Sequence, residues 1–160
     1  MSIEFKKAIP GDEKTVSALR REIWADVYRG IYPDDAIDGY DFSYHEARDL
    51  ARINDPDTTV CLITDGEAPV GYLYFADRGS VHIGSLYLKR ECRGQGAGRR
   101  AFELVRSYCR GKGYASFTCN CNAHNSPALA FYARMGGRET ERDVGHENRQ
   151  EDQVKFEFEV

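Results

Sequence analysis

A glycine-rich, basic turn between a strand and a helix constrains this chain more than any other stretch of its sequence. The segment 85–99 begins with residues typical of a buried strand and ends in a turn that leads directly into a helix. Gly94, Gly96 and Gly98 lack a Cβ atom, so the backbone can adopt positive φ and approach a ligand closely. The helix directs its first unpaired N–H groups and its dipole at the turn. The sequence therefore predicts a site for an anion such as phosphate or pyrophosphate.

Two common phosphate-binding motifs do not fit this turn. A P-loop would end in Lys-Ser or Lys-Thr, where this chain has Arg99-Arg100. A dinucleotide fingerprint would need a third glycine at an offset that is absent here, and it would lie early in a βαβ unit. The pattern that fits is Arg/Gln-x-x-Gly-x-Gly/Ala, filled by Arg93, Gly96 and Gly98. An ordinary glycine-rich turn without a ligand is the structural alternative.

The composition is that of one globular domain. With 160 residues, 41% hydrophobic and 30% charged, the chain can bury roughly two-thirds of its unfolded surface. No apolar run approaches the ~20 residues of a membrane-spanning helix, and Glu4, Lys6 and Lys7 interrupt any secretory signal. Five cysteines without disulfide-like spacing indicate buried thiols in a reducing cytoplasm. Cys119 and Cys121 alone do not make a zinc site, and no metal is expected.

Charge is distributed unevenly along the chain. The net charge of −4 argues against general nucleic-acid binding. Between residues 26 and 41, five aspartates accompany the single Arg29, whereas six basic residues between 93 and 112 accompany only Glu103. The first segment could attract a cation and the second an anion. Two solvated faces of opposite sign would give the same pattern.

Hydrophobic periodicity predicts elements in the order β-α-α-β-β-β-α-β-α-β-β. Asp12 and the sequence Ser43-Tyr44-His45-Glu46 are expected to cap the first two helices, with an acidic connection over 31–42 between them. Directly joined strands should be antiparallel neighbours, and the strand–helix–strand unit from Ser85 to Cys121 should be a right-handed parallel crossover. The predicted strands are 2–9, 58–64, 69–76, 80–89, 114–121, 138–144 and 153–160, and the helices are 12–30, 43–53, 97–113 and 128–135.

The glycine turn resembles the pyrophosphate loop of the GCN5-related N-acetyltransferases, and a second segment agrees with it. Residues 125–136 are similar to the family's other cofactor segment, Asn…Ala…Phe-Tyr…Gly, which follows the fifth strand. Because both motifs occur in the family's order and separation, the resemblance covers nearly the whole chain. It implies an α/β fold with an α+β mixed sheet, mostly antiparallel with a central splayed parallel pair, in a single domain over residues 1–160.

The resemblance also implies a reaction and a cofactor. The chain would move the acetyl group of acetyl-CoA to a primary amine by direct attack, through a tetrahedral intermediate. The pantetheine arm would lie along the main chain of Leu86, Tyr87 and Leu88, much as an added strand would. Asn125 would steady the pantetheine or thiol end, although it could serve only as an N-cap. The pyrophosphate would bind the turn, formed by Arg93, Gly94, Gln95, Gly96, Ala97, Gly98 and Arg99.

Tyr132 is the expected general acid, and it also borders the cofactor in this interpretation. A phenol with a pKa of about 10 can protonate a departing thiolate whose thiol has a pKa of about 8.5. A base is also needed, because an alkyl amine is protonated at neutral pH. His82 lies where many relatives carry a glutamate, and Glu22 and Asp26 are weaker candidates. The structural alternatives are a core position for Tyr132 and a solvent-facing or hydrogen-bonded edge position for His82.

The first helix and the 30–42 connection are expected to form the acceptor site. Trp24, Tyr28 and Tyr32 offer aromatic faces, which suit a cationic amine. Negative charge in the same region comes from Asp34, Asp35 and Asp38. Polyamines, aminoglycosides and basic peptides all fit this description. Core packing of the aromatic residues and a solvated acidic loop are the alternative. The histidines at 45, 124 and 146 show no ligand spacing and are assigned no role.

Other functions are compatible with the same motifs. A non-catalytic acyl-CoA-binding sensor domain would keep the glycine turn but would not need Tyr132. An enzyme that acts on protein N-termini, or with longer acyl chains, would need an open acceptor groove. Relatives often dimerise through their last strands, so a homodimer is also compatible with the resemblance.

Overall fold

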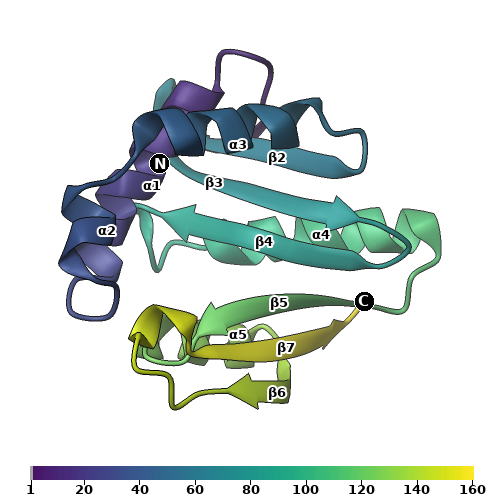
Figure 1. Ribbon diagram of the computed structural model, residues 1–160. Coiled ribbons are helices and arrows are strands. Elements are labelled where there is room, and N and C mark those ends of the chain that lie inside the picture. Colours follow the sequence, from purple (N-terminus) through teal and green to yellow (C-terminus); the bar gives the residue numbers. More distant parts are fainter. Residues whose placement is uncertain (1) are drawn as a thin grey trace.

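Seven strands of this chain form one sheet that carries helices on both faces (Figure 1). The computed structural model describes residues 2–160. The helices are α1 (Glu13–Val27), α2 (Asp34–Asp38), α3 (Phe42–Asn54), α4 (Ala97–Lys112) and α5 (Ser126–Arg134). The strands are β1 (Ile3–Lys7), β2 (Thr58–Asp65), β3 (Ala68–Asp77), β4 (Val81–Leu88), β5 (Ser116–Asn122), β6 (Arg138–Asp143) and β7 (Gln153–Glu159).

The strand order in the sheet is β1-β2-β3-β4-β5-β7-β6. Only β4 and β5 pair in parallel, and α4 connects them. Every other neighbouring pair is antiparallel. The predicted meander, the parallel pair and the mixed α/β class are therefore confirmed.

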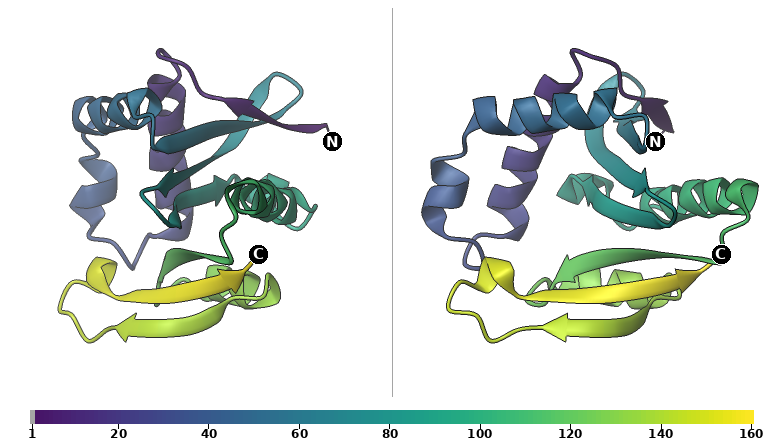
Figure 2. Two further views of the ribbon diagram at one scale, coloured as in Figure 1. Left: turned by 90° about the vertical axis from the view of Figure 1, so that its right-hand side faces the viewer. Right: turned by 45° about the vertical axis from the view of Figure 1, so that its right-hand side comes forward.

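The two faces of the sheet carry separate cores. One core packs α4 and α5 against the sheet through fully buried aromatic residues such as Phe102, Phe117 and Phe158. The other packs α1 through Val16 and Ile23 against the β2–β3 half of the sheet. Figure 2 shows α1 and α3 on the side of the sheet opposite to α4. The helices on that side cover the β1–β4 half and leave β5, β7 and β6 uncovered there (Figure 1).

Three local predictions near the first helices were wrong. The side chain of Asp12 does not cap α1, because its Oδ2 accepts a hydrogen bond from the main-chain N–H of Ile9 instead. The cap of α3 is Asp41, whose Oδ1 accepts from the N–H of Tyr44, so the helix starts before the predicted Ser43 cap. The connection over 31–42 contains the short helix α2, which begins directly after Pro33. At the start of α3, Asp41 lies two residues before the predicted Ser43 cap and offers the same side-chain cap chemistry.

A buried ion pair joins α1 to α3. Arg20 donates through both terminal nitrogens to the carboxylate of Asp49, at 2.6 and 2.8 Å. The two side chains are 5% and 2% exposed, and Arg52 of α3 also reaches Asp49 at 3.1 Å. Removing one partner would leave an uncompensated charge in the interior, which is far more costly than losing a surface pair.

The outer edge of the sheet is charged. All six residues of β6 are exposed and five of them are charged. Arg138 pairs with Glu157 of β7, and Arg142 pairs with Glu139 within the strand. Charged edge strands discourage pairing with other chains. Dimerisation through the last strands stays a prediction. Within residues 2–160, no helix has the length and apolarity that crossing a bilayer requires.

The Arg20–Asp49 pair generates a stability prediction. Asp49→Asn should lower the free energy of unfolding by roughly 3–5 kcal/mol, because it strands a buried guanidinium. Urea denaturation measures this loss. Asp57→Asn is the matched control, since Asp57 pairs with Arg78 at an exposed position, where the expected loss is at most about 1 kcal/mol. Equal losses in the two variants would contradict the structural importance of the buried pair.

Candidate active site

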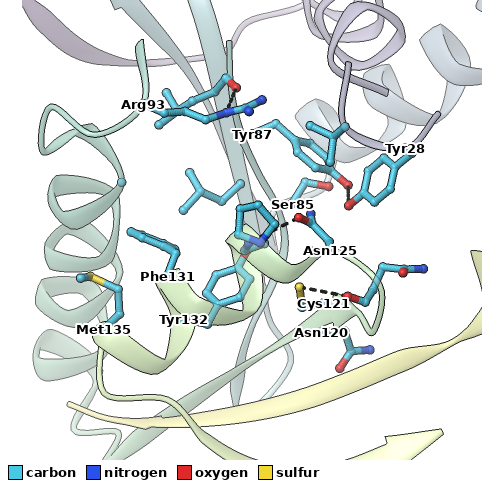
Figure 3. Close-up of a pocket in the computed structure, with 18 of the residues that line it drawn as sticks. Tyr28, Ser85, Tyr87, Arg93, Asn120, Cys121, Asn125, Phe131, Tyr132 and Met135 are labelled. Atoms are coloured by element: carbon cyan, nitrogen blue, oxygen red, sulfur yellow. Dashed lines mark hydrogen bonds between the residues drawn. The ribbon is translucent and has the colours of Figure 1, made fainter. Parts of the chain in front are cut away.

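A cleft opens where β4 and β5 diverge. The two strands pair only from Val81↔Phe117 to Ile83↔Cys119. Beyond that point β4 continues to Leu88 along β3, so its other edge faces a gap rather than a strand. The resulting cleft has a volume of about 1050 Å³ and extends from the glycine turn to the ends of β5 and α1. Figure 3 shows side chains from β4, β5 and α5 converging on it.

A bulge in β4 shapes the middle of this cleft. The register shifts between Tyr74 and Phe75 of β3, which leaves Gly84 as the extra residue between Ile83 and Ser85. A Cβ atom on Gly84 would lie 1.9 Å from the Tyr74 ring. Glycine is therefore required here so that Tyr74 can lie against the strand and form part of the cleft wall.

The glycine turn closes one end of the cleft. Gly94 and Gly96 have φ of +74° and +89°, as the sequence suggested for such residues. Gly98 does not adopt positive φ. A Cβ atom at Gly98 would lie 2.8 Å from the ring of Phe131, so the third glycine is needed for close packing of α5 on α4. Gly96 immediately precedes α4, and the turn presents the start of that helix to the cleft.

Two arginines beside the turn already have an acidic partner. Arg93 donates from Nε to the carbonyl of Leu88 at 3.0 Å and from Nη2 to Asp26 of α1 at 3.2 Å. Arg90 donates to the other carboxylate oxygen of Asp26. Asp26, the first residue of the acidic segment 26–41, therefore forms ion pairs with the basic residues beside the turn, at the edge of the cleft.

Most of the predicted cofactor residues line this one cleft. They are Leu86, Tyr87, Leu88, Arg93, Gly94, Gly96, Gly98, Arg99, Asn125 and Tyr132. Gln95 and Ala97 lie behind the wall. The Gln95 side chain donates to the carbonyl of Glu91, and Ala97 is buried in the first turn of α4. The cradle fits a long anionic ligand, because it combines an unpaired strand edge, a helix N-terminus and Cβ-free backbone.

Tyr132 and Asn125 come from the second predicted motif. Asn125 caps α5, with its Oδ1 accepting from the N–H of Ala128 at 3.3 Å, and its side chain also lies in the cleft wall. The Tyr132 ring packs among Phe102, Phe131 and Phe156, and it forms part of the wall as well. Burial raises the pKa of the Tyr132 hydroxyl well above its usual value. Tyr132 is therefore both a core residue and a protonated group on the cleft.

A tyrosine cluster forms the wall on the side of α1. The hydroxyls of Tyr28 and Tyr87 lie 3.1 Å apart (Figure 3). The ring of Tyr32 stacks on Tyr28 with centroids 4.1 Å apart. All three line the cleft. Burial raises the pKa of the Tyr28 and Tyr87 hydroxyls, so both stay protonated at neutral pH.

The other two predicted acceptor residues are not brought into the wall. Trp24 packs edge-on against Tyr32 and Tyr40, behind the tyrosine cluster. Asp34 is exposed and pairs with Arg29, which also holds Asp38. Among the wall residues that the structure describes, Asp26 is the one carboxylate, and it is occupied by arginines.

His82 lies in the wall near the point where β4 and β5 separate. Its Nδ1 is 2.7 Å from the hydroxyl of Thr118 on β5. Burial and the nearby Lys155 lower the pKa of His82, so the imidazole is neutral at pH 7. Glu22, one of the weaker candidates for the base, is outside the wall and pairs with Lys89.

One cluster in the wall was missed by sequence reasoning. Asp152, whose side chain is 5% exposed, accepts from His124 Nε2 at 2.7 Å and from His146 Nδ1 at 2.6 Å. His124 belongs to the cleft wall. The sequence hinted at a role for His124, because it directly precedes the motif residue Asn125. Its partner Asp152 lies 28 residues further along the chain, so the pair could not be found from local spacing.

The chain is similar in sequence to known acetyltransferases. The family model described as the acetyltransferase (GNAT) family matches residues 20–137. The peptidyl-lysine N-acetyltransferase YjaB of Salmonella typhimurium is 31% identical over 80 residues. That alignment spans half of this chain and half of YjaB.

Solved structures share the fold over the whole chain. The PaiA N-acetyltransferase of Thermoplasma acidophilum, solved in complex with coenzyme A, superposes with a TM-score of 0.86 at 20% identity and full coverage of both chains. NAA60 of Arabidopsis thaliana, in complex with a bisubstrate analogue, gives a TM-score of 0.72 at 18% identity, with 99% of each chain covered. At such identities the superpositions establish the fold.

Proposed function

The chain belongs to the GNAT acetyltransferase family, and from this we propose that it transfers the acetyl group of acetyl-CoA to a primary amine. The proposal rests on three features that line the same cleft. These are the glycine turn at the start of α4, the unpaired edge of β4 and the buried hydroxyl of Tyr132. A binding function alone would account for the first two features but not for the third.

Acetyl-CoA supplies an activated thioester to this site when it is bound. The backbone of Gly94 and Gly96 and the start of α4 would hold its pyrophosphate. The free edge of β4 from Leu86 to Leu88 would bind the pantetheine amides as an added strand. Asn125 lines the cleft and uses only its Oδ1 in the cap bond to Ala128, so its side-chain amide keeps N–H donors for the cofactor.

Tyr132 would act as general acid toward the departing sulfur. Because burial raises the pKa of the Tyr132 hydroxyl, it holds its proton at neutral pH. The same buried environment disfavours a thiolate, so proton transfer from Tyr132 would remove a poorly solvated anion. Cys121 does not compete as a nucleophile, since burial raises the pKa of its thiol to about 12.

His82 would accept a proton from the nitrogen during attack. Its lowered pKa keeps the imidazole in the neutral form that can accept a proton. Thr118 fixes the ring through Nδ1. His82 would thereby take the role of the glutamate that many relatives carry at this position.

The acceptor would enter between the tyrosine cluster and β5. Tyr28 and Tyr32 give this part of the wall aromatic faces and protonated hydroxyls, which can bind an amine without a carboxylate. The acceptor amine is carried by a small molecule or a peptide in this proposal. YjaB is named a peptidyl-lysine N-acetyltransferase, so a lysine side chain is a reasonable first acceptor to assay.

Binding of acetyl-CoA should depend on the glycine turn. Gly96→Glu places a carboxylate and a side chain at the anion seat, and calorimetric titration should show at least a tenfold loss of acetyl-CoA affinity, which corresponds to about 1.4 kcal/mol. Gly113→Glu is the matched control. Gly113 also has positive φ and open space around it, but it ends α4 far from the turn. Unchanged binding in Gly96→Glu would contradict this cofactor position.

Removing the Tyr132 hydroxyl should impair turnover and spare binding. Tyr132→Phe keeps the ring in its aromatic contacts, so the fold and the acetyl-CoA affinity should be retained. The kcat for acetyl transfer should fall about 10²-fold, the usual contribution of a general acid. Thiol release from acetyl-CoA measures this rate. A wild-type protein that binds acetyl-CoA but transfers acetyl to no amine would instead support the sensor alternative.

The pH dependence of kcat should report His82. Because burial and Lys155 lower the pKa of His82 below 6.5, the imidazole stays neutral at pH 7, and kcat should decline only as the pH falls below 6.5. His82→Gln should lower kcat and remove this acidic limb. Thr118→Val is the control, since it removes the hydrogen bond to Nδ1 but keeps the imidazole. Persistence of the limb in His82→Gln would assign it to another group.

A further inference from the structure

The nitrogen of an alkylammonium must lose two protons to become an amide, and His82 and Tyr132 account for only one of them. The first proton leaves before attack, because a protonated amine has no lone pair. The second leaves as the C–N bond forms. At neutral pH an alkyl amine arrives almost wholly protonated. A group that removes the first proton therefore remains to be identified.

The one carboxylate in the cleft wall is not free to take this proton. Among the wall residues described by the structure, it belongs to Asp26, which is paired with Arg90 and Arg93 beside the glycine turn. Burial raises the pKa of the Tyr28 and Tyr87 hydroxyls, so these groups are protonated and do not act as the base. The base must therefore be another group in the wall that carries a free lone pair.

We propose that the His124–Asp152 pair takes this first proton from the acceptor, an inference that rests on the proposed acetyl transfer. A carboxylate can only accept a hydrogen bond, so His124 donates from Nε2 to Asp152. Nδ1 of His124 then carries the lone pair, and within residues 2–160 it has no hydrogen-bond partner. The side chain is 36% exposed and forms part of the cleft wall, where an incoming amine can reach it.

Asp152 holds the His124 ring in place. Asp152 is buried and keeps its negative charge, since the hydrogen bond from His124 and those from His146 hold the pKa of its carboxyl far below the usual range. The hydrogen bond from Nε2 to this carboxylate leaves Nδ1 as the nitrogen of His124 that can accept a proton. After the transfer, the ring would remain in contact with the Asp152 carboxylate.

The main chain fixes the position of His124 as well. Its N–H donates to the side chain of Asn122 at 2.9 Å, while the Asn122 amide donates to the carbonyl of Arg149 at 3.0 Å. The N–H of Ala123 donates to the carbonyl of Asp152 at 2.9 Å. These bonds join the start of the β5–α5 loop to the segment before β7. The imidazole is thereby held next to Asn125 in the cleft wall.

The protons balance over one turnover. The ammonium transfers a proton to His124 Nδ1 and becomes a neutral amine. The amine attacks, the C–N bond forms and the C–S bond breaks. The nitrogen gives its second proton to His82, Tyr132 gives its proton to the sulfur, and the proton on His82 restores Tyr132. His124 releases its proton to solvent, which is the one proton that the overall reaction produces.

Two small amines separate this role from a structural one. Propylamine is protonated at neutral pH, whereas 2,2,2-trifluoroethylamine is largely neutral there and needs no such base. His124→Gln keeps a donor for Asp152 but cannot take a proton. Its kcat/KM for propylamine at pH 7 should fall about 10²-fold relative to wild type, and that for trifluoroethylamine should stay near the wild-type value. His45→Gln is the control, because it changes an imidazole on α3 that is outside the cleft wall, and it should affect neither amine.

The outcomes distinguish this inference from the proposed function. Equal losses for both amines in His124→Gln, or no loss for either, would overturn the role of His124 while acetyl transfer by the wild type stood. Wild-type protein that binds acetyl-CoA but acetylates neither these amines nor a lysine peptide would overturn both.

Nitrogen-15 NMR of the wild-type protein, labelled at histidine, gives a readout independent of activity. In the free protein at the pH of the assay, the nitrogen shifts should show a proton on Nε2 of His124 and none on Nδ1, as the hydrogen bond to Asp152 requires. A proton on Nδ1 would overturn the inference, because that nitrogen could then accept no proton from the amine.

Discussion

The separation of β4 from β5 after three residue pairs is the constraint on which the rest of the site depends. Parallel neighbours normally share a full ladder, and here the ladder stops at Ile83 because Gly84 bulges beneath the Tyr74 ring. The remaining length of β4 keeps β3 on one side only, so its free edge and the start of α4 face the same cleft. One glycine and one tyrosine thus turn an ordinary crossover unit into a binding site.

The helices on the opposite side of the sheet hold the acceptor wall against this cleft. The Arg20–Asp49 pair fixes α1 to α3, and α1 in turn positions Tyr28 against Tyr87. Ion pairing of Asp26 with Arg90 and Arg93 ties the end of α1 to the segment before α4. The acceptor wall and the anion-binding turn are therefore parts of one connected assembly, although they are far apart in the sequence.

Local patterns predicted the seven strands and four of the five helices, because these elements rest on residues close together in the chain. The turn at Gly94 and Gly96, the cap at Asn125 and the parallel crossover followed from spacing and from the family resemblance. The acidic segment was predicted to bind the acceptor amine. In the structure, Asp34 and Asp38 form ion pairs with Arg29, which lies only a few residues away in the chain and takes the place of a cationic ligand. Asp152 could not be paired with His124 in advance, since the contact depends on how the segment before β7 folds back onto the β5–α5 loop.

The free edge of β4 also bears on how this protein remains unaggregated. An unpaired strand edge can recruit a strand from another chain, and the outermost strand, β6, is protected by six exposed residues that are nearly all charged. Along Leu86–Leu88 no charged side chain offers that protection, and the proposed pantetheine binding needs these N–H and C=O groups to be accessible. Protection there comes from location, since α1 and α5 flank the edge within the molecule. A flexible arm of pantetheine width can enter this space, whereas a strand belonging to another folded sheet would first have to displace those helices.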